Sequence, residues 1–142
     1  SATDLPKFIN LTDEALFAKV KANAAALKSG VDLLNEMTIR GITTGINERN
    51  DIQLYGTGAS GQIDINAQGF PAQSYSGPDS VLDTNNDNDC LSLWEALIED
   101  GASKAAIFIV NYENNGTCTY RLSENVSFGF HYIPTTGEVE SL

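Results

Sequence analysis

Residues 12–39, TDEALFAKVKANAAALKSGVDLLNEMTI, set the architecture of this chain. Their apolar side chains recur at steps of three and four: Leu16, Val20, Ala24, Leu27, Val31, Leu34 and Met37. Because an α-helix has 3.6 residues per turn, this spacing predicts one continuous apolar stripe along a helix. We expect Thr12 to be the N-cap and Gly41 to end the helix. At about 1.5 Å per residue it is roughly 40 Å long, which makes it the spine of the domain.

The remaining elements are predicted from alternation and turn residues. A second helix is expected over 89–98, with Asp89 as its N-cap and a buried face made of Leu91, Trp94, Leu97 and Ile98. Strands are expected at residues 51–55, 62–66, 105–112, 117–122, 127–133 and 138–140. The apolar run 105–110 is typical of a central strand, and we expect the long helix to cover it. The polar residues 72–89 predict a long surface loop.

Size and charge limit the possible functions. A chain of 142 residues is expected to form one domain, residues 1–142, with its own core. Its 19 acidic and 8 basic residues give a net charge of -11. So acidic a surface repels phosphate backbones and anionic membranes, and we therefore expect no nucleic-acid partner.

The two cysteines, Cys90 and Cys118, allow two interpretations. With a single histidine and no C-x-x-C spacing, they do not make a zinc site of the finger type. They are either two free thiols of a cytosolic protein or one disulfide of an exported domain, and we favour the disulfide. Closing a loop of about 29 residues would stabilise the fold by roughly 3–4 kcal/mol.

No residue pattern predicts an enzyme or a cofactor. His131, the single histidine, lies in a predicted strand and has no motif partner for acid–base work. Residues 56–61 match the spacing G-x-G-x-x-G, but residues 62–66 alternate like a strand. A dinucleotide-binding loop needs a helix there, so that the pyrophosphate meets the helix N-terminus. We therefore expect no nucleotide site.

One acidic segment resembles the start of a calcium-binding loop. Its oxygen-bearing side chains stand at alternate positions: Asp83, Asn85, Asp87 and Asp89. However, Asn88 stands where such a loop has glycine, and Trp94 stands where it has a bidentate glutamate. We favour a solvated loop that holds no metal.

The beginning of the sequence carries neither a signal peptide nor 18 consecutive apolar residues. Residues 1–4, SATD, lack an initiating methionine and run directly into the helical segment. We therefore expect that a preceding segment has been removed from this chain.

Five short blocks, in this order, give the chain a resemblance to type IV pilins, especially the mannose-sensitive haemagglutinin type of Gram-negative bacteria. They are LPKFINL at 5–11, GFP at 69–71, DCLSLWEAL at 89–97, CTY at 118–120 and YIPTTGEV at 132–139. The family's leader-peptidase site, methylated first residue, assembly glutamate and apolar stem are absent from the sequence. Residues 41–60 and 75–89 match no family pattern.

The resemblance implies an α+β fold of the pilin type, in which a long N-terminal helix packs on an antiparallel sheet of about four strands, with a second short helix. It implies a structural subunit that waits in the inner membrane and then polymerises with other pilin subunits into an extracellular fibre for adhesion or motility. A Cys90–Cys118 disulfide would pin the second helix to a strand. Residues 41–60 and 75–89 would make contacts with neighbouring subunits or surfaces. No catalytic, cofactor or metal residue is implied.

Two other functions stay open at this point. The same fold serves minor pilins and type II secretion pseudopilins, which build short periplasmic fibres. A secreted ligand-binding module is the alternative from a different class.

Overall fold

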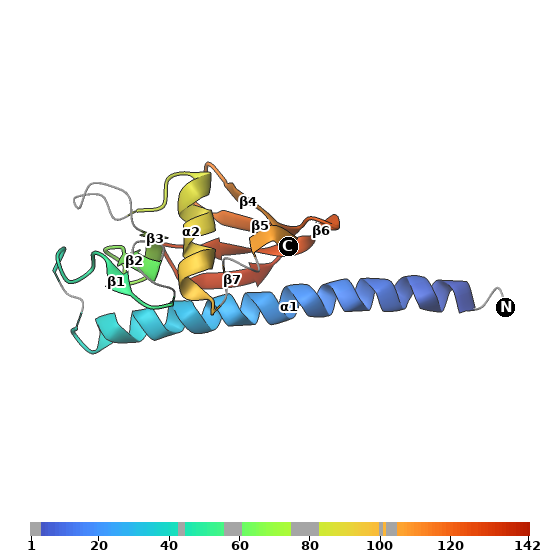
Figure 1. Ribbon diagram of the computed structural model, residues 1–142, viewed down its shortest axis with the longest axis horizontal. Coiled ribbons are helices and arrows are strands. Elements are labelled where there is room, and N and C mark those ends of the chain that lie inside the picture. Colours follow the sequence, from blue (N-terminus) through green and yellow to red (C-terminus); the bar gives the residue numbers. More distant parts are fainter. Residues whose placement is uncertain (1–3, 43–44, 56–60, 75–82, 100, 102–104) are drawn as a thin grey trace.

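The computed structural model describes residues 4–42, 45–55, 61–74, 83–99, 101 and 105–142. It is an α+β structure in which one long helix carries a short helix and two antiparallel sheets (Figure 1). The elements are α1 (Asp4–Ile39), β1 (Ile52–Gln53), β2 (Gln62–Ile65), β3 (Pro71–Ser74), α2 (Asp87–Leu97), the 3-10 turn η2 (Ala105–Ile107), β4 (Phe108–Tyr112), β5 (Cys118–Leu122), β6 (Asn125–Ile133) and β7 (Glu138–Ser141).

Helix α1 is longer than predicted, because it begins at Asp4 and not after Thr12. The prediction of Thr12 as N-cap is therefore wrong. Pro6 lies in the first turn, where a helix does not use the N–H that proline lacks. At the other end Gly41 adopts a φ of 75° and the N–H of Ile42 donates to the carbonyl of Met37 over 2.9 Å, which closes the helix with a Schellman motif.

The predicted apolar stripe is the face of α1 that packs on the domain. Its centre is fully buried at Leu27, Val31 and Leu34, and Val20 is also buried. Within the described side chains, the stripe thus joins one core with α2 and both sheets.

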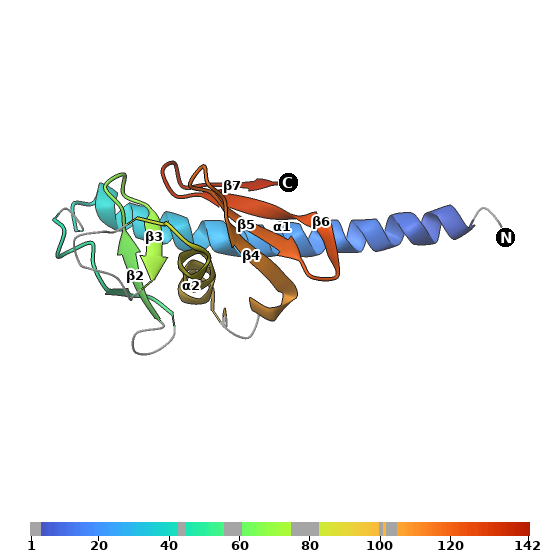
Figure 2. The ribbon, with the colours of Figure 1, turned by 90° about the horizontal axis from the view of Figure 1, so that it is seen from above.

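The larger sheet has the strand order β4-β5-β6-β7, and all its pairs are antiparallel. Helix α1 runs along β6 and β7, whereas α2 lies across β4 and β5 (Figure 2). The prediction that residues 105–112 form a central strand under the long helix is therefore wrong. Residues 105–107 are a 3-10 turn, and β4 is an edge strand covered by α2. The apolar run does not report the position of a strand in a sheet: Phe108 is buried against Trp94, whereas Ile109 is exposed on the other face of β4.

A smaller sheet, β1-β2-β3, lies near the C-terminal end of α1 (Figure 1). Its third strand begins at Pro71, so the predicted surface loop over residues 72–89 is wrong at its start. The polar composition of that segment concealed a strand whose Gln73 is buried against β2. The buried amide of Asn66 connects the two sheets, because its Nδ2 donates to the carbonyl of Pro134 over 2.7 Å.

Two buried tyrosines predict that the domain loses stability in alkali. The hydroxyl of Tyr120 donates to the carbonyl of Cys90, and that of Tyr132 donates to the carbonyl of Pro71. Burial raises the pKa of both hydroxyls above their ordinary value of 10.0. The unfolded chain releases these protons near pH 10 and the folded chain retains them. The stabilisation is therefore complete below about pH 10 and falls above it, by about 1.4 kcal/mol per pH unit for each tyrosine.

This alkaline loss is measured by urea unfolding at increasing pH, with tyrosinate absorbance recorded in parallel. Tyr120→Phe should halve the slope of stability against pH. If both tyrosines ionised near pH 10 while the protein stayed folded, the assignment of the slope to them would be wrong.

Candidate functional site

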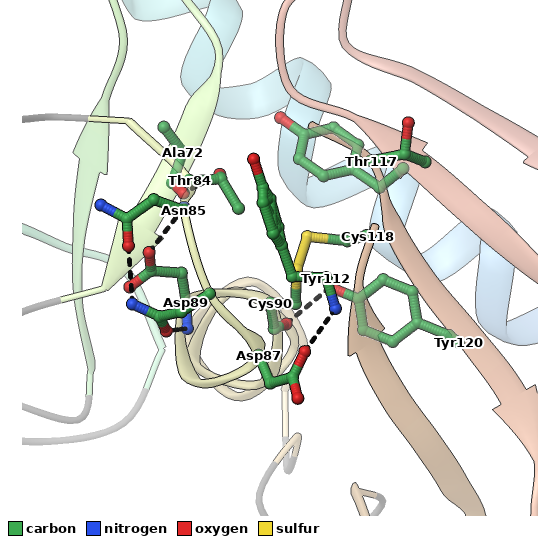
Figure 3. Close-up of a disulfide and its surroundings, with 12 residues drawn as sticks. Ala72, Thr84, Asn85, Asp87, Asp89, Cys90, Tyr112, Thr117, Cys118 and Tyr120 are labelled. Atoms are coloured by element: carbon green, nitrogen blue, oxygen red, sulfur yellow. Dashed lines mark hydrogen bonds between the residues drawn. A yellow bond between two sulfur atoms is a disulfide. The ribbon is translucent and has the colours of Figure 1, made fainter. Parts of the chain in front are cut away.

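The two cysteines form a disulfide, as expected from the sequence. Cys90 lies in the first turns of α2 and Cys118 begins β5, and their Cα atoms are 5.4 Å apart. Both side chains are fully buried. The bond therefore attaches the start of α2 to the larger sheet from within the core (Figure 3).

Two further contacts hold α2 against the sheet beside the disulfide. The Tyr120 hydroxyl donates to the Cys90 carbonyl over 2.6 Å, and the Tyr112 N–H donates to Asp87 Oδ1 over 2.6 Å (Figure 3). The sequence did not identify either contact, since each joins residues more than twenty positions apart. The only local signal was the pair of acidic residues in the first turn of α2, Asp87 and Asp89, which the helix dipole favours.

Two carboxylates of the segment that resembles a calcium-binding loop, Asp87 and Asp89, form hydrogen bonds at the start of α2. The N-cap is Asn86 and not Asp89, so that prediction is wrong: Asn86 Oδ1 accepts the Asp89 N–H, and Asp89 Oδ2 accepts the Asn85 N–H. Burial raises the pKa of the Asp89 carboxyl, partly offset by the backbone hydrogen bonds of Asn85 and Asn86. Because several residues that commonly form N-caps follow one another here, the sequence left the exact first residue of α2 ambiguous.

The four candidate calcium ligands do not converge. Asp87 is turned toward β4 and Asp89 toward Asn85 (Figure 3). The side chains of Asp83 and Asn85 are exposed. Over the ranges that the structure describes, no three histidine, cysteine, aspartate or glutamate side chains gather as metal ligands. This segment builds the capped start of a helix.

The predicted buried face of α2 is correct in all but one position. Trp94, Leu97 and Ile98 are buried, but Leu91 is half-buried and Leu93 is buried in its place. Leu91 instead faces a groove beside β4. The helix is therefore rotated slightly from the predicted orientation, since the disulfide at Cys90 and the ring of Trp94 set which side meets the sheet.

His131 lies on the outer face of the larger sheet. Its Nε2 is 2.9 Å from Glu140 Oε2 on the neighbouring strand β7. The hydrogen bond from His131 is the main cause that lowers the pKa of the Glu140 carboxyl. This cross-strand pair ties the last strand to β6.

The G-x-G-x-x-G segment at 56–61 falls mostly outside the described residues, which resume at Gly61. The next element in the chain is the strand β2, as the alternation of residues 62–66 predicted. Residues 43–44 and 75–82, within the two segments that match no pilin pattern, also lie outside the described part of the chain.

The first part of α1 extends beyond the sheets (Figures 1 and 2). The head, meaning α2 together with the two sheets, is joined to α1 by Lys19, whose ammonium is 2.6 Å from a carboxylate oxygen of Glu124 in the β5–β6 turn, and by Leu16, which packs on the core. Before that point, Leu16 is half-buried and Phe17 is 54% exposed. An exposed series of alanines continues along one side of α1: Ala15, Ala18, Ala22 and Ala26. These small side chains suit close packing of another helix.

A shallow hollow of about 480 Å³ lies where α1 meets the end of α2. Its described lining is mostly apolar, with Leu33 from α1, Ile98 after α2 and the ring of Tyr55. Glu99 is the one charged side chain among these described lining residues. Such a hollow is suited to a small apolar ligand or side chain.

Comparison with protein-family models, with curated proteins and with solved structures finds no match to this chain. The class that the structure itself defines is an α+β protein with one long helix, a short helix and antiparallel sheets. Among the described residues, no helix has the length and apolar character needed to cross a bilayer.

Proposed function

We propose that this protein is a type IV pilin, a structural subunit that polymerises into a surface fibre for adhesion or motility. The proposal rests on the ordered sequence blocks and on the agreement of the general architecture with what that family implies. In this proposal the subunit waits in the inner membrane, assembles with other pilin subunits, and is displayed outside the cell.

The observation that carries the proposal is the part of α1 before Lys19. It extends beyond the sheets and exposes Phe17 together with Ala15 and Ala18. Helices in proteins gain most of their stability from packing an apolar face, so a long exposed segment of this kind calls for a partner. Copies of the same helix from other subunits would supply that partner. A contact between different surfaces of identical subunits does not close, and therefore builds a filament.

The disulfide fits a subunit exposed outside the cell. Oxidising compartments preserve disulfides, and this one restrains α2 against the sheet. A head that is covalently restrained resists local opening, and so it also resists proteases that cleave transiently opened chains.

The proposal predicts that Phe17→Glu in the full-length subunit abolishes fibres. The introduced carboxylate would be buried between helices of neighbouring subunits without a partner. The free-energy cost of burying such a charge would prevent assembly. Fibres sheared from cells that produce the variant are counted by electron microscopy. The head itself should keep its urea midpoint, since Phe17 contributes little to the core.

Ile109→Glu is the matched control, because Ile109 is 44% exposed and lies in β4, a strand covered by α2 and not by α1. Fibres should persist in this variant. Normal fibres with Phe17→Glu would contradict the proposal. So would a conventional signal peptide encoded upstream of Ser1, where a pilin requires a basic leader and about 20 apolar residues.

Cells that lack the protein separate the alternatives. If such cells still produce fibres, its role is that of a minor pilin or pseudopilin. Ligand binding, the function from a different class, is favoured by the hollow at Tyr55 and Leu33. An apolar fluorescent dye displaced from that hollow by Leu33→Glu, together with a conventional signal peptide, would support it.

A further inference from the structure

Strand β4 is an edge strand that lacks the charged side chains by which many edge strands are protected. The larger sheet has two edges, β4 and β7. Strand β7 carries Glu138 and Glu140 on its exposed positions, as edge strands commonly do to prevent pairing with other chains. Strand β4, with the sequence FIVNY, carries no charge, and its Ile109 is 44% exposed. Strand β4 therefore has the composition of a central strand, although it pairs with a neighbouring strand, β5, on one side only.

The direction of the free backbone groups is given by one hydrogen bond. The N–H of Tyr112 donates to Asp87 on α2, so it points away from β5. In an antiparallel pair, every second residue directs its N–H and C=O to the same side. Val110 therefore directs its N–H and its C=O away from β5. The carbonyl of Phe108 points to the same side. These are the groups that an added strand would bind.

A groove of about 360 Å³ lies along this edge, between β4 and α2. One side of α2 forms its wall, with Asp87, Asn88, Leu91 and Glu95. The other wall has Phe108 and Val110, which alternate along β4, and Ala106 from the 3-10 turn before it. A strand added to β4 would lie about 4.8 Å from it. Every second side chain of that strand would then enter the space beside Leu91.

The negative charge of the groove indicates which kind of polypeptide would bind there. Asp87 and Glu95 are both acidic, and the described residues that line the groove include no basic side chain. A second copy of this chain carries a net charge of -11, so its approach to these carboxylates is opposed by repulsion. Like charges on neighbouring strands are destabilising. A strand with basic side chains would instead be attracted.

We propose that the groove between β4 and α2 binds an extended polypeptide in which apolar and basic side chains alternate, and that this peptide adds to the sheet at Val110. The apolar side chains would pack on Leu91 and Phe108, and the basic ones would approach Asp87 and Glu95. Backbone pairing would supply affinity, and the two carboxylates would supply selectivity. Binding of such a strand does not depend on whether the protein forms fibres.

The probe is a short capped peptide in which lysine and valine alternate, titrated into the folded domain. Amide signals of Val110 and its neighbours should shift in two-dimensional NMR spectra, and binding should weaken as salt is added. A peptide with glutamate in place of lysine should bind about tenfold more weakly or not at all. A peptide N-methylated at alternate residues keeps its charge but does not pair, and it should lose binding as well.

Two variants test the assignment on the protein. Val110→Pro removes the outward N–H and leaves the bonds to β5, a position that edge strands tolerate. It should weaken binding about tenfold, the effect of one or two hydrogen bonds. Glu95→Lys should do the same by reversing the charge. Glu14→Lys, the matched control on the exposed part of α1, should bind as the unmodified protein does.

Three outcomes would overturn the proposal. The N-methylated peptide could bind as well as its parent, which would make the groove a charged surface and not a site of strand addition. The glutamate peptide could bind equally, which would remove the role of Asp87 and Glu95. The protein alone could dimerise through β4, as judged by sedimentation with and without Val110→Pro, which would make the occupant a second copy. The N-methylated peptide decides the question even if Val110→Pro fails to fold.

Discussion

Replacing both cysteines with alanine is expected to lower the free energy of unfolding by about 3–4 kcal/mol. Cys90 and Cys118 are 28 positions apart, so their bond closes a long loop in the unfolded chain and reduces its conformational freedom. The bond also connects α2 to β5 inside the core, where Tyr120 donates to the carbonyl of Cys90. Urea unfolding of the oxidised protein and of Cys90→Ala/Cys118→Ala gives the difference.

The control uses the same protein in reductant. The chain contains only these two cysteines, so a reductant acts at this bond alone. Reduced protein and the double variant should therefore unfold at similar urea concentrations. A loss below about 1 kcal/mol would mean that α2 is held by packing and hydrogen bonds, and that the disulfide contributes little.

Trp94→Ala is expected to lower the free energy of unfolding by about 3–5 kcal/mol. The ring is fully buried at the centre of the aromatic cluster. Its centroid lies 4.9 Å from that of Phe108, 5.8 Å from that of Tyr120 and 6.1 Å from that of Phe130. Its Nε1 donates to the carbonyl of Gly101, which holds the segment after α2. Alanine would leave a cavity and an unsatisfied buried carbonyl.

Trp94→Phe separates these two causes. It keeps most of the ring packing but loses the hydrogen bond to Gly101, so its cost should be well under that of Trp94→Ala. Near-ultraviolet circular dichroism and urea unfolding check both variants. Equal costs would show that the hydrogen bond dominates and that the aromatic contacts around Trp94 add little.

Much of the secondary structure could be predicted from local patterns. The apolar stripe of residues 12–39 identified the spine helix, and alternation identified β2 and the strands after α2 to within a few residues. The errors have local causes too. Thr12 and the acidic residues after it have the composition of a helix start, although the helix runs through them from Asp4, and the cap-forming series before Cys90 hid the N-cap at Asn86.

Less of the candidate site than of the secondary structure could be predicted from the sequence. Counting the cysteines was enough to favour the disulfide, because two cysteines allow only one pairing within the chain. The contact of Asp87 with Tyr112 was not predicted, and neither was the role of β4 as an edge strand. Both depend on which strand neighbours which, and no local pattern encodes that.

Local spacing and composition are therefore sufficient for the long helix, its apolar face and the acidic charge, and they favoured the single disulfide that the structure shows. Each of these depends on neighbouring residues or on simple counts. The placement of α1 over β6 and β7, of α2 over β4, and of an uncharged edge strand beside two carboxylates emerges only in the folded domain. Strand order is set by contacts between residues far apart in the chain, whose free energies balance only when the whole core is assembled.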